Sequence, residues 1–154
     1  MQGRMKQYQI GKADIEAILI AEKVGRLATQ NPDGFPYITP VHFVYYNERI
    51  YIHGLCKGQK ISNIKQNSKV GFEVDKMEGL ILSDKPCDVN TAYESVIIQG
   101  EASLAGDDIK EVALKEIVKK YTPQLSGISF PDNMIKATAV IEIIPTGITG
   151  KRYE

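Results

Sequence analysis

The chain has 154 residues, of which 43% are hydrophobic and 25% charged, and these values exclude disorder or a coiled coil over its whole length. Nineteen basic residues balance nineteen acidic ones, so the zero net charge argues against a nucleic-acid partner. The longest apolar runs, at 17–21 and 140–141, fall far short of the roughly 20 residues of a membrane span, which predicts no membrane association. With no export leader and two cysteines, we expect a single cytoplasmic domain over 1–154.

Three segments have features of helices. Asp14 can cap a first helix that Gly25 ends. Residues 57–66 suggest a short helix opened by a glycine, and residues 107–121 form the clearest one, with acidic residues at its start and lysines at its end. The expected apolar positions are Ile15, Ile18 and Leu19 in the first helix and Ile109, Val112, Ala113, Ile117 and Tyr121 in the last.

Aromatic and β-branched residues predict strands between these helices. Residues 76–91 have weak periodicity, which favours a loop with a possible short helix. About six antiparallel strands in hairpin-like succession, with flanking helices, predict a mainly β protein of the α+β class that closes into a small barrel. After the segment 26–29, the expected strands span residues 35–46, 49–54, 69–75, 93–104 and 137–144.

One predicted hairpin brings together the only two histidines of the chain. If Asn47 and Glu48 form a two-residue turn, the numbers of paired residues sum to 95, so His42 lies opposite His53. Alternation then places five apolar or aromatic residues toward the barrel interior: Val41, Phe43, Tyr45, Ile50 and Ile52. The outward face carries His42, Val44, Tyr46, Tyr51 and His53.

Three interpretations of this outward face remain open. It can be a polar face that solvent or a second subunit covers, or a metal site with Cys56 as a third ligand. The third possibility is a platform on which aromatic rings stack on a planar ligand and histidines donate hydrogen bonds. The metal interpretation lacks a fourth ligand and any spacing typical of metal motifs.

The segment after the hairpin fits a phosphate. Lys57 and Lys60 flank the start of a predicted helix, whose N–H groups attract anions, and Gly58 allows close approach of the backbone. The alternative is that both lysines are solvated surface residues. Beside the histidine face, this segment predicts a site for a planar ring with a phosphate tail, such as FMN.

Several short motifs of the chain resemble those of the FMN-binding split-barrel proteins similar to pyridoxamine 5′-phosphate oxidase. Within that family, the resemblance is strongest to the nitroimidazole-resistance branch. The resemblance extends from about residue 10 to residue 151. It rests on the order of GRLAT (25–29), GFPY (34–37), PVHF (40–43), IYIH (50–53), KGQKISNI (57–64), YESV (93–96) with Gly100, and TGITGK (146–151).

The resemblance implies a split β-barrel homodimer with FMN in clefts between the subunits. It also implies a function, the reduction of small electron-poor molecules such as nitroaromatics, with His53 as the catalytic proton donor near the substrate. A non-catalytic flavin- or haem-binding module is the alternative. The cofactor-binding residues that the resemblance implies are Thr39, Pro40, Val41, His42, His53, Gly54, Gln59 and Lys60, with Tyr93 and Ser95 coming from the partner subunit.

Two departures from the family pattern bear on function. The chain ends in residues 149–154 without the arginine-rich substrate motifs of true pyridoxamine phosphate oxidases, which argues against oxidation of that vitamin. Gln59 stands where many relatives have a second basic residue, so the phosphate contact can shift to Lys57.

Overall fold

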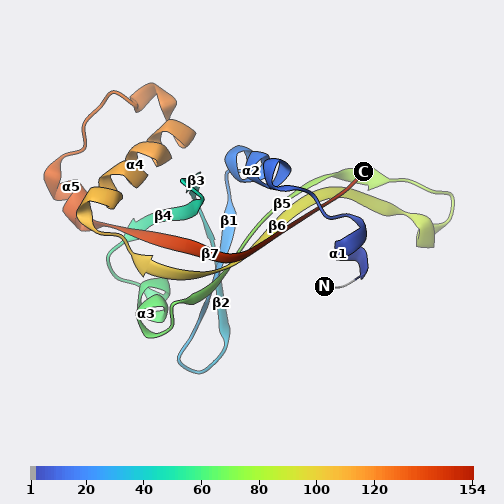
Figure 1. The fold of residues 1–154 in the computed structure, drawn as a ribbon, viewed down its shortest axis with the longest axis horizontal. Coiled ribbons are helices and arrows are strands. Elements are labelled where there is room, and N and C mark those ends of the chain that lie inside the picture. Colours follow the sequence, from blue (N-terminus) through green and yellow to red (C-terminus); the bar gives the residue numbers. More distant parts are fainter. Residues whose placement is uncertain (1–2) are drawn as a thin grey trace.

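The computed structural model describes residues 3–154, whose strands form one antiparallel sheet (Figure 1). The seven strands lie in the order β2-β1-β5-β6-β7-β4-β3. Their bounds are β1 (Gly25–Gln30), β2 (Pro36–Val41), β3 (Val44–Tyr46), β4 (Arg49–Leu55), β5 (Lys69–Ile81), β6 (Asn90–Leu104) and β7 (Thr138–Tyr153).

The sheet closes on itself because its two edge strands are neighbours in the sequence. β2 and β3 lie at opposite ends of the strand order, yet only His42 and Phe43 connect them. Two residues span less than about 10 Å, so the two edges must meet. The expected split β-barrel is therefore confirmed, with the segment 35–46 divided into two strands rather than one.

Five α-helices accompany the sheet, of which α4 and α5 lie together at one end (Figure 1). No helix within residues 3–154 is long and apolar enough to cross a membrane. The helices are α1 (Gly3–Gln7), α2 (Lys12–Ala21), α3 (Gln59–Gln66), α4 (Asp107–Tyr121) and α5 (Asp132–Ala137), and the short 3-10 turns are η1 (Pro86–Asp88) and η2 (Pro123–Leu125).

The apolar residues form two clusters on opposite sides of the β3–β4 hairpin. The larger cluster fills the barrel and includes Phe43, Ile50, Ile52 and Phe72. The smaller one lies between the hairpin and α4 and contains Val44, Tyr51, Ala113, Leu114, Ile117 and Val140. Part of the expected apolar face of α4 is wrong, because Ile109 and Val112 are exposed while Leu114 is buried.

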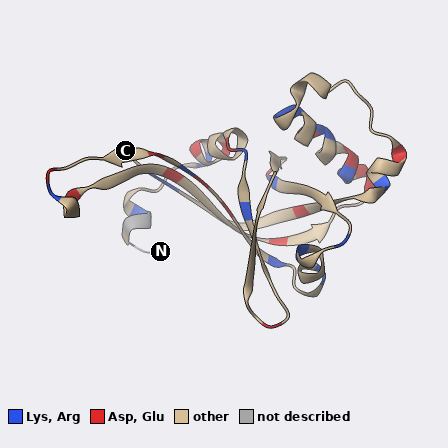
Figure 2. Ribbon diagram, turned by 180° about the vertical axis from the view of Figure 1, so that it is seen from behind, with Lys and Arg blue, Asp and Glu red and all other residues tan. Residues whose placement is uncertain are grey.

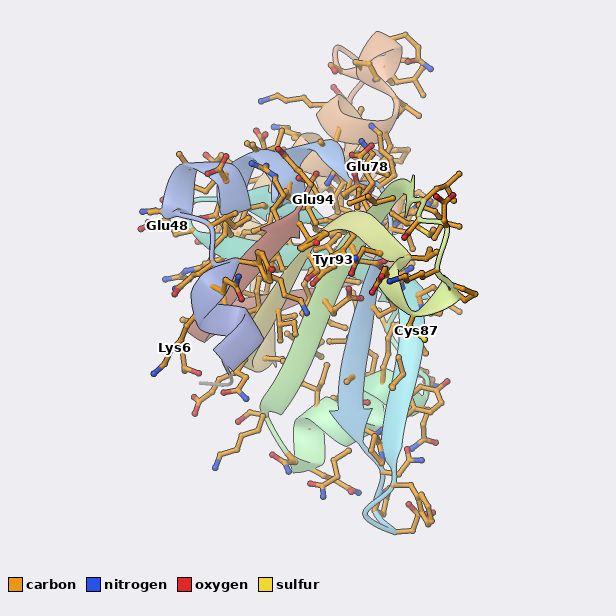
Figure 3. All side chains as sticks on the ribbon, turned by 90° about the vertical axis from the view of Figure 1, so that its right-hand side faces the viewer. Lys6, Glu48, Glu78, Cys87, Tyr93 and Glu94 are labelled. Carbon is orange, nitrogen blue, oxygen red and sulfur yellow. The ribbon has the colours of Figure 1, made fainter. Side chains whose placement is uncertain are left out.

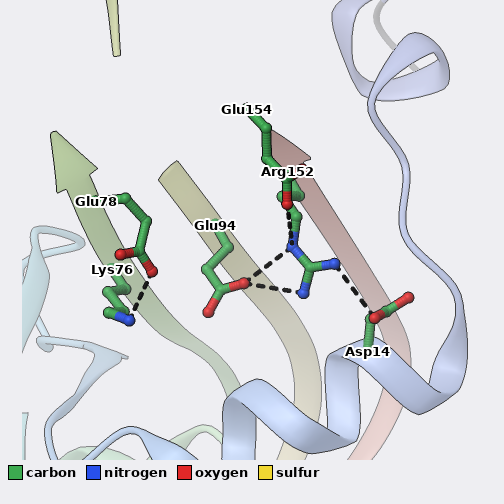
Figure 4. A network of polar contacts seen from close by, with 6 residues as sticks. All are labelled: Asp14, Lys76, Glu78, Glu94, Arg152 and Glu154. Atoms are coloured by element: carbon green, nitrogen blue, oxygen red, sulfur yellow. Dashed lines mark hydrogen bonds and ion pairs between the residues drawn. The ribbon is translucent and has the colours of Figure 1, made fainter. Parts of the chain in front are cut away.

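Two residues at the ends of α2 have other roles than those expected. Gly11 precedes the helix without a side-chain cap, and the Asp14 carboxylate pairs instead with Arg152 at 3.3 Å (Figure 4). Arg152 also binds Glu94 at 3.0 Å, which ties β7 to β6. Gly25 begins β1 rather than ending a helix, and a Cβ there would lie 2.2 Å from the Phe72 ring, so packing requires the glycine.

The longest difference from the expected elements is a two-stranded arm. Residues 76–91 were expected to be in part a loop, with a possible short helix, and residues 82–89 fit this because they connect two strands and contain η1. The remainder is strand, since β5 runs to Ile81 and pairs with β6 from Asn90, with a bulge next to Gly79. The arm extends away from α4 and α5 (Figure 1), and residues of both charge signs lie along it (Figure 2). β7 also continues nine residues past the expected end, from Ile144 to Tyr153, because β6 pairs with it along that length.

Candidate functional site

The histidine hairpin folds in the predicted register. Asn47 and Glu48 form the turn with positive φ angles of 50° and 59°, and Val44 pairs with Tyr51. The residue numbers of all three pairs between 44–46 and 49–51 sum to 95, which confirms the predicted turn and register. The ladder ends at Val44 and Tyr51, however, so His42 lies in the connection between β2 and β3 and does not pair with His53, which pairs with Val140 of β7. The interior face is also confirmed, since Phe43, Ile50 and Ile52 are buried in the barrel with Val41 and Tyr45 packed against them.

The other face of the hairpin was expected to be covered by solvent, a second subunit or a ligand. Instead, α4 of the same chain covers its middle. Val44 and Tyr51 are only 6% and 4% exposed under that helix. His42 and His53 remain exposed beyond it, and the His42 ring stacks on Tyr121 with centroids 4.6 Å apart. A helix rather than a second subunit therefore buries the aromatic part of this face.

Lys60 lies over the end of β4. The nearest atoms to a Cβ built on Gly54 are Cε and Nζ of Lys60, at 3.7 and 3.8 Å. The lysine stands in the first turn of α3, which begins after Gly58 (φ 142°) with no side-chain cap, so the first N–H groups of the helix are free for an anion.

A buried amide fixes the position of α3 against the barrel. Asn63 is fully buried and donates to the Thr29 hydroxyl and to the Asn31 side chain, both at 2.9 Å. It also accepts a hydrogen bond from Gln59 at 2.7 Å. The side chain of Gln59 is thus engaged within the helix, and its effect on a ligand is through the position of the helix start.

His53, His42 and Lys60 form one electrostatic group. Protein packed around the ring of His53 removes water from it, and the positive charges of His42 and Lys60 add to this effect, so the pKa of His53 lies below its usual 6.5. His53 is consequently neutral at pH 7. The Lys60 ammonium is therefore the group here that would attract an anion at pH 7.

An open cavity of about 350 Å³ lies beside His42. It is lined by Val24, from the loop between α2 and β1, and by Pro40, Val41 and His42 at the end of β2. The neighbouring Thr39 hydroxyl is buried and has no hydrogen-bond partner among residues 3–154. Three predicted cofactor-binding residues therefore meet at a surface that can accept a flat, partly apolar ligand.

Tyr93 and Ser95 do not join this group. Tyr93 lines a separate cavity of about 340 Å³ at the base of the arm, together with Tyr8, Cys87 and Tyr153. Figure 3 shows Tyr93 on β6 and Cys87 on the arm. Ser95 pairs with Asp75 and Lys151 in the middle of the sheet. Within one chain, these two residues lie apart from the histidines.

The structure adds contacts that sequence reasoning did not identify. Val24 lines the cavity, Asn63 anchors α3, and Tyr121 contacts His42 although it was expected only as an apolar helix position. The signal for Asn63 was present, since it stands between Ile61 and Ile64 on the buried face of its helix. No local pattern indicates the contact between Tyr121 and His42.

In the part of the chain that the structure describes, no cluster of side chains supports the interpretation of the histidine face as a metal site. No group of three His, Cys, Asp or Glu residues there could hold a metal ion. The Cys56 thiol, the expected third ligand, lies 3.1 Å from the carbonyl oxygen of Ala137.

Solved structures share this fold. A candidate 5-nitroimidazole antibiotic resistance protein from Bacteroides thetaiotaomicron is 26% identical, with a TM-score of 0.80 over 93% of this chain and 85% of that one. A flavocytochrome from Azotobacter vinelandii is 21% identical, with a TM-score of 0.87 over 99% and 72%. An FAD- and haem-binding protein from Mycobacterium smegmatis is 17% identical, with a TM-score of 0.88 over 96% and 74%.

Sequence comparison assigns the family. No curated protein is significantly similar to the chain. A family model described as pyridoxamine 5′-phosphate oxidase matches residues 11–152, which include every element from α2 to the end of β7 except its last residue. The chain therefore belongs to the pyridoxamine 5′-phosphate oxidase family.

Proposed function

We propose that this protein is an FMN-dependent reductase of small electron-poor molecules, with nitroaromatics such as nitroimidazoles as substrates. The observation that carries the proposal is the position of Lys60 over Gly54, next to His53 and His42. Lys60, which would bind the phosphate, and His53, which would transfer the proton, thus lie a few residues apart. The 26% identity to the candidate nitroimidazole resistance protein supports the substrate class.

The residues present fit a flavin phosphate and ring. Lys60 and the free N–H groups of α3 would hold the phosphate, and the cavity beside Val41 and His42 would receive part of the ring. The unpartnered Thr39 hydroxyl is a polar group that the chain alone leaves unsatisfied. When bound, the flavin supplies the hydride chemistry.

His53 would deliver the proton that accompanies reduction of the substrate. Only its charged form can act as the acid, and burial, His42 and Lys60 lower its pKa below 6.5. Proton delivery should therefore become faster as the pH falls from 7 toward that pKa. His42, in the connection between β2 and β3, would support the flavin rather than the chemistry.

The proposal includes a homodimer in which the second subunit supplies Tyr93 and Ser95. Both residues lie away from the histidines of their own chain, next to an arm whose apolar side chains are uncovered. Leu80 and Leu82 on that arm are 57% and 80% exposed, as expected for residues that a second subunit covers. A reducing cytoplasm suits the two cysteines, neither of which forms a disulfide.

A haem-binding module is the second candidate. The observation in its favour is that the two histidines are exposed and adjacent, as an axial ligand must be accessible. The flavocytochrome and the FAD- and haem-binding protein share the fold. In this case the histidines would bind iron and His53 would have no role in proton transfer.

The absorbance spectrum of the freshly purified protein separates the two candidates. Flavin bands support the proposal, and mass spectrometry of the released compound distinguishes FMN from FAD. A Soret band that His42→Ala or His53→Ala abolishes supports the haem module instead. A colourless protein that takes up neither cofactor contradicts both.

Turnover tests the role of His53 in the flavin-loaded protein. With a chemical electron donor, His53→Ala should reduce nitroimidazole about 10²- to 10⁴-fold more slowly while keeping its flavin. In the wild type, kcat/KM should rise as the pH falls below 7, and the variant should lose this dependence. Normal turnover by His53→Ala with full flavin would remove the residue from the mechanism.

A further inference from the structure

The hydroxyl of Tyr121, the last residue of α4, lies within hydrogen-bonding distance of three backbone groups outside its helix. Its hydroxyl accepts from the N–H of Phe43 at 2.9 Å. The carbonyl oxygens of Phe43 and Lys23 lie 2.9 and 2.8 Å from the same hydroxyl, which donates its single proton to one of them at a time. One side chain therefore connects the C-terminal end of α4 to two other parts of the chain.

The two backbone segments that Tyr121 binds are the walls of the cavity beside His42. Lys23 immediately precedes Val24, and Phe43 immediately follows His42, and both Val24 and His42 line the cavity. Tyr121 itself does not line it. Its hydroxyl thus links the two backbone segments that carry these lining residues.

The ring of Tyr121 makes a further contact with the site. It stacks on His42 with an angle of 28° between the planes, which holds one face of the imidazole. Phe43 lies in the two-residue connection between β2 and β3, where the backbone leaves the sheet ladder. Its N–H and C=O groups would lose these hydrogen bonds without the tyrosine hydroxyl.

We propose that Tyr121 is a positioning residue for the cofactor, an inference that rests on the proposed flavin function. Through its hydroxyl it sets the spacing between Val24 and the end of β2, and through its ring it orients His42. Burial raises the pKa of Tyr121, so the hydroxyl keeps its proton at neutral pH and both of its hydrogen-bonding roles persist.

Two substitutions separate the hydroxyl from the ring. Tyr121→Phe keeps the stack on His42 and removes the hydrogen bonds, and we expect the FMN dissociation constant to rise about 3- to 10-fold. Tyr121→Leu removes both and should raise it about 10- to 100-fold. In a His42→Ala background, the difference between the two variants should disappear. Tyr46→Phe, at an exposed tyrosine of the same hairpin, is the matched control.

Nuclear magnetic resonance on the flavin-free protein tests the contact independently of the cofactor. The ring protons of His42 should shift in Tyr121→Leu and stay in place in Tyr46→Phe. If the ring protons of His42 do not shift in Tyr121→Leu, the positioning role is wrong. It is also wrong if both Tyr121 variants bind FMN like the wild type while unfolding at a lower urea concentration. If the ring protons respond but the wild type binds no flavin, the proposed cofactor is wrong while the Tyr121–His42 coupling stands.

Discussion

The β3–β4 hairpin and the β5–β6 arm are both two-stranded ribbons, but they are covered in different ways. One face of the hairpin packs into the barrel through Ile50 and Ile52, and the other lies under α4. The arm, by contrast, leaves Met77, Leu80 and Leu82 largely exposed. An isolated hairpin is marginally stable in water, so in the proposed homodimer we expect the second subunit to cover these leucines.

A single chain covers both faces of the hairpin but leaves the arm largely uncovered. The hairpin, with His42, His53 and the nearby Lys60, has its packing and its positioning contacts within the chain. The arm and the adjacent Tyr93 have not. We therefore expect substitutions in the hairpin to change the stability of the chain, and substitutions in the arm to change assembly.

The largest effect should come from the arm. Burying a leucine stabilises an interface by about 1.5–3 kcal/mol, and in a twofold dimer each substitution removes this contribution from both subunits. Replacing Leu80 and Leu82 by serine should thus raise the dimer dissociation constant more than about 100-fold, as measured by analytical ultracentrifugation. The matched control Ile20→Ser, at a comparably exposed residue of α2, should leave the dimer intact. An unchanged dimer in the arm variant would show that the second subunit does not cover these leucines.

The hairpin should respond in stability instead. Ile52 is fully buried, so Ile52→Ala should lower the free energy of unfolding by about 2–5 kcal/mol in urea titrations. Ile128→Ala, at an exposed residue, should change it by less than about 0.5 kcal/mol. Equal effects at the two sites would contradict the difference in packing on which the comparison rests.

Lys60 tests the ligand-binding end of the hairpin. Lys60→Ala should weaken FMN by about 1.5–3 kcal/mol, or roughly 10- to 100-fold, and riboflavin far less, because only FMN carries the phosphate. Isothermal titration with both flavins measures the difference. Lys65→Ala, in the last turn of the same helix, should affect neither. Equal losses for both flavins would place Lys60 away from the phosphate.

The smallest effect concerns Lys120, behind the hairpin. Its ammonium lies 3.8 Å from the centroid of the Phe43 ring, and burial, with the charge of Lys23, lowers its pKa from 10.5 to about 8. Between pH 8 and 10.5 the folded chain therefore holds fewer protons than the unfolded one, so this group makes stability rise with pH. Lys120→Met should remove that rise from urea titrations.

Lys119→Met is the neighbouring control for this pH dependence. The hydrogen bond to Glu116 raises the pKa of Lys119, so its contribution is present below 10.5 and is lost as the pH increases further. The two substitutions should thus change the slope in opposite directions. The same slope in wild type and Lys120→Met would show that the ammonium is better solvated than its burial indicates.

Local patterns predicted the hairpin well because its geometry is set within a few residues. The turn at Asn47 and Glu48 fixes the register, and alternation then fixes the faces. The same holds for α4, whose bounds match the predicted 107–121. What the sequence did not indicate is that α4 folds back onto the hairpin, which is a long-range contact.

The arm and β7 were underestimated for a related reason. The outer residues of β7 pair over a long sequence separation, as Tyr153 does with Tyr93. The arm pairs locally, as Ile81 does with Asn90, but it carries mixed polar and apolar side chains without clear alternation. Of the site, the sequence predicted the proximity of His42 and His53 and, from its place at the start of a helix, the phosphate-binding role of Lys60, with which the resemblance agrees. Val24 and Tyr121 could not be found this way, because their roles arise only when the loop after α2 meets the end of α4.

The position of β7 in the sheet has a consequence for how the chain folds. β1–β2 and β3–β4 can form during synthesis because each pair is local, but the last strand lies between β6 and β4. Until residues 138–153 leave the ribosome, two strand edges stay open and the barrel cannot close. We expect the nascent chain to need protection from aggregation up to this point, and closure to be the slow step of folding.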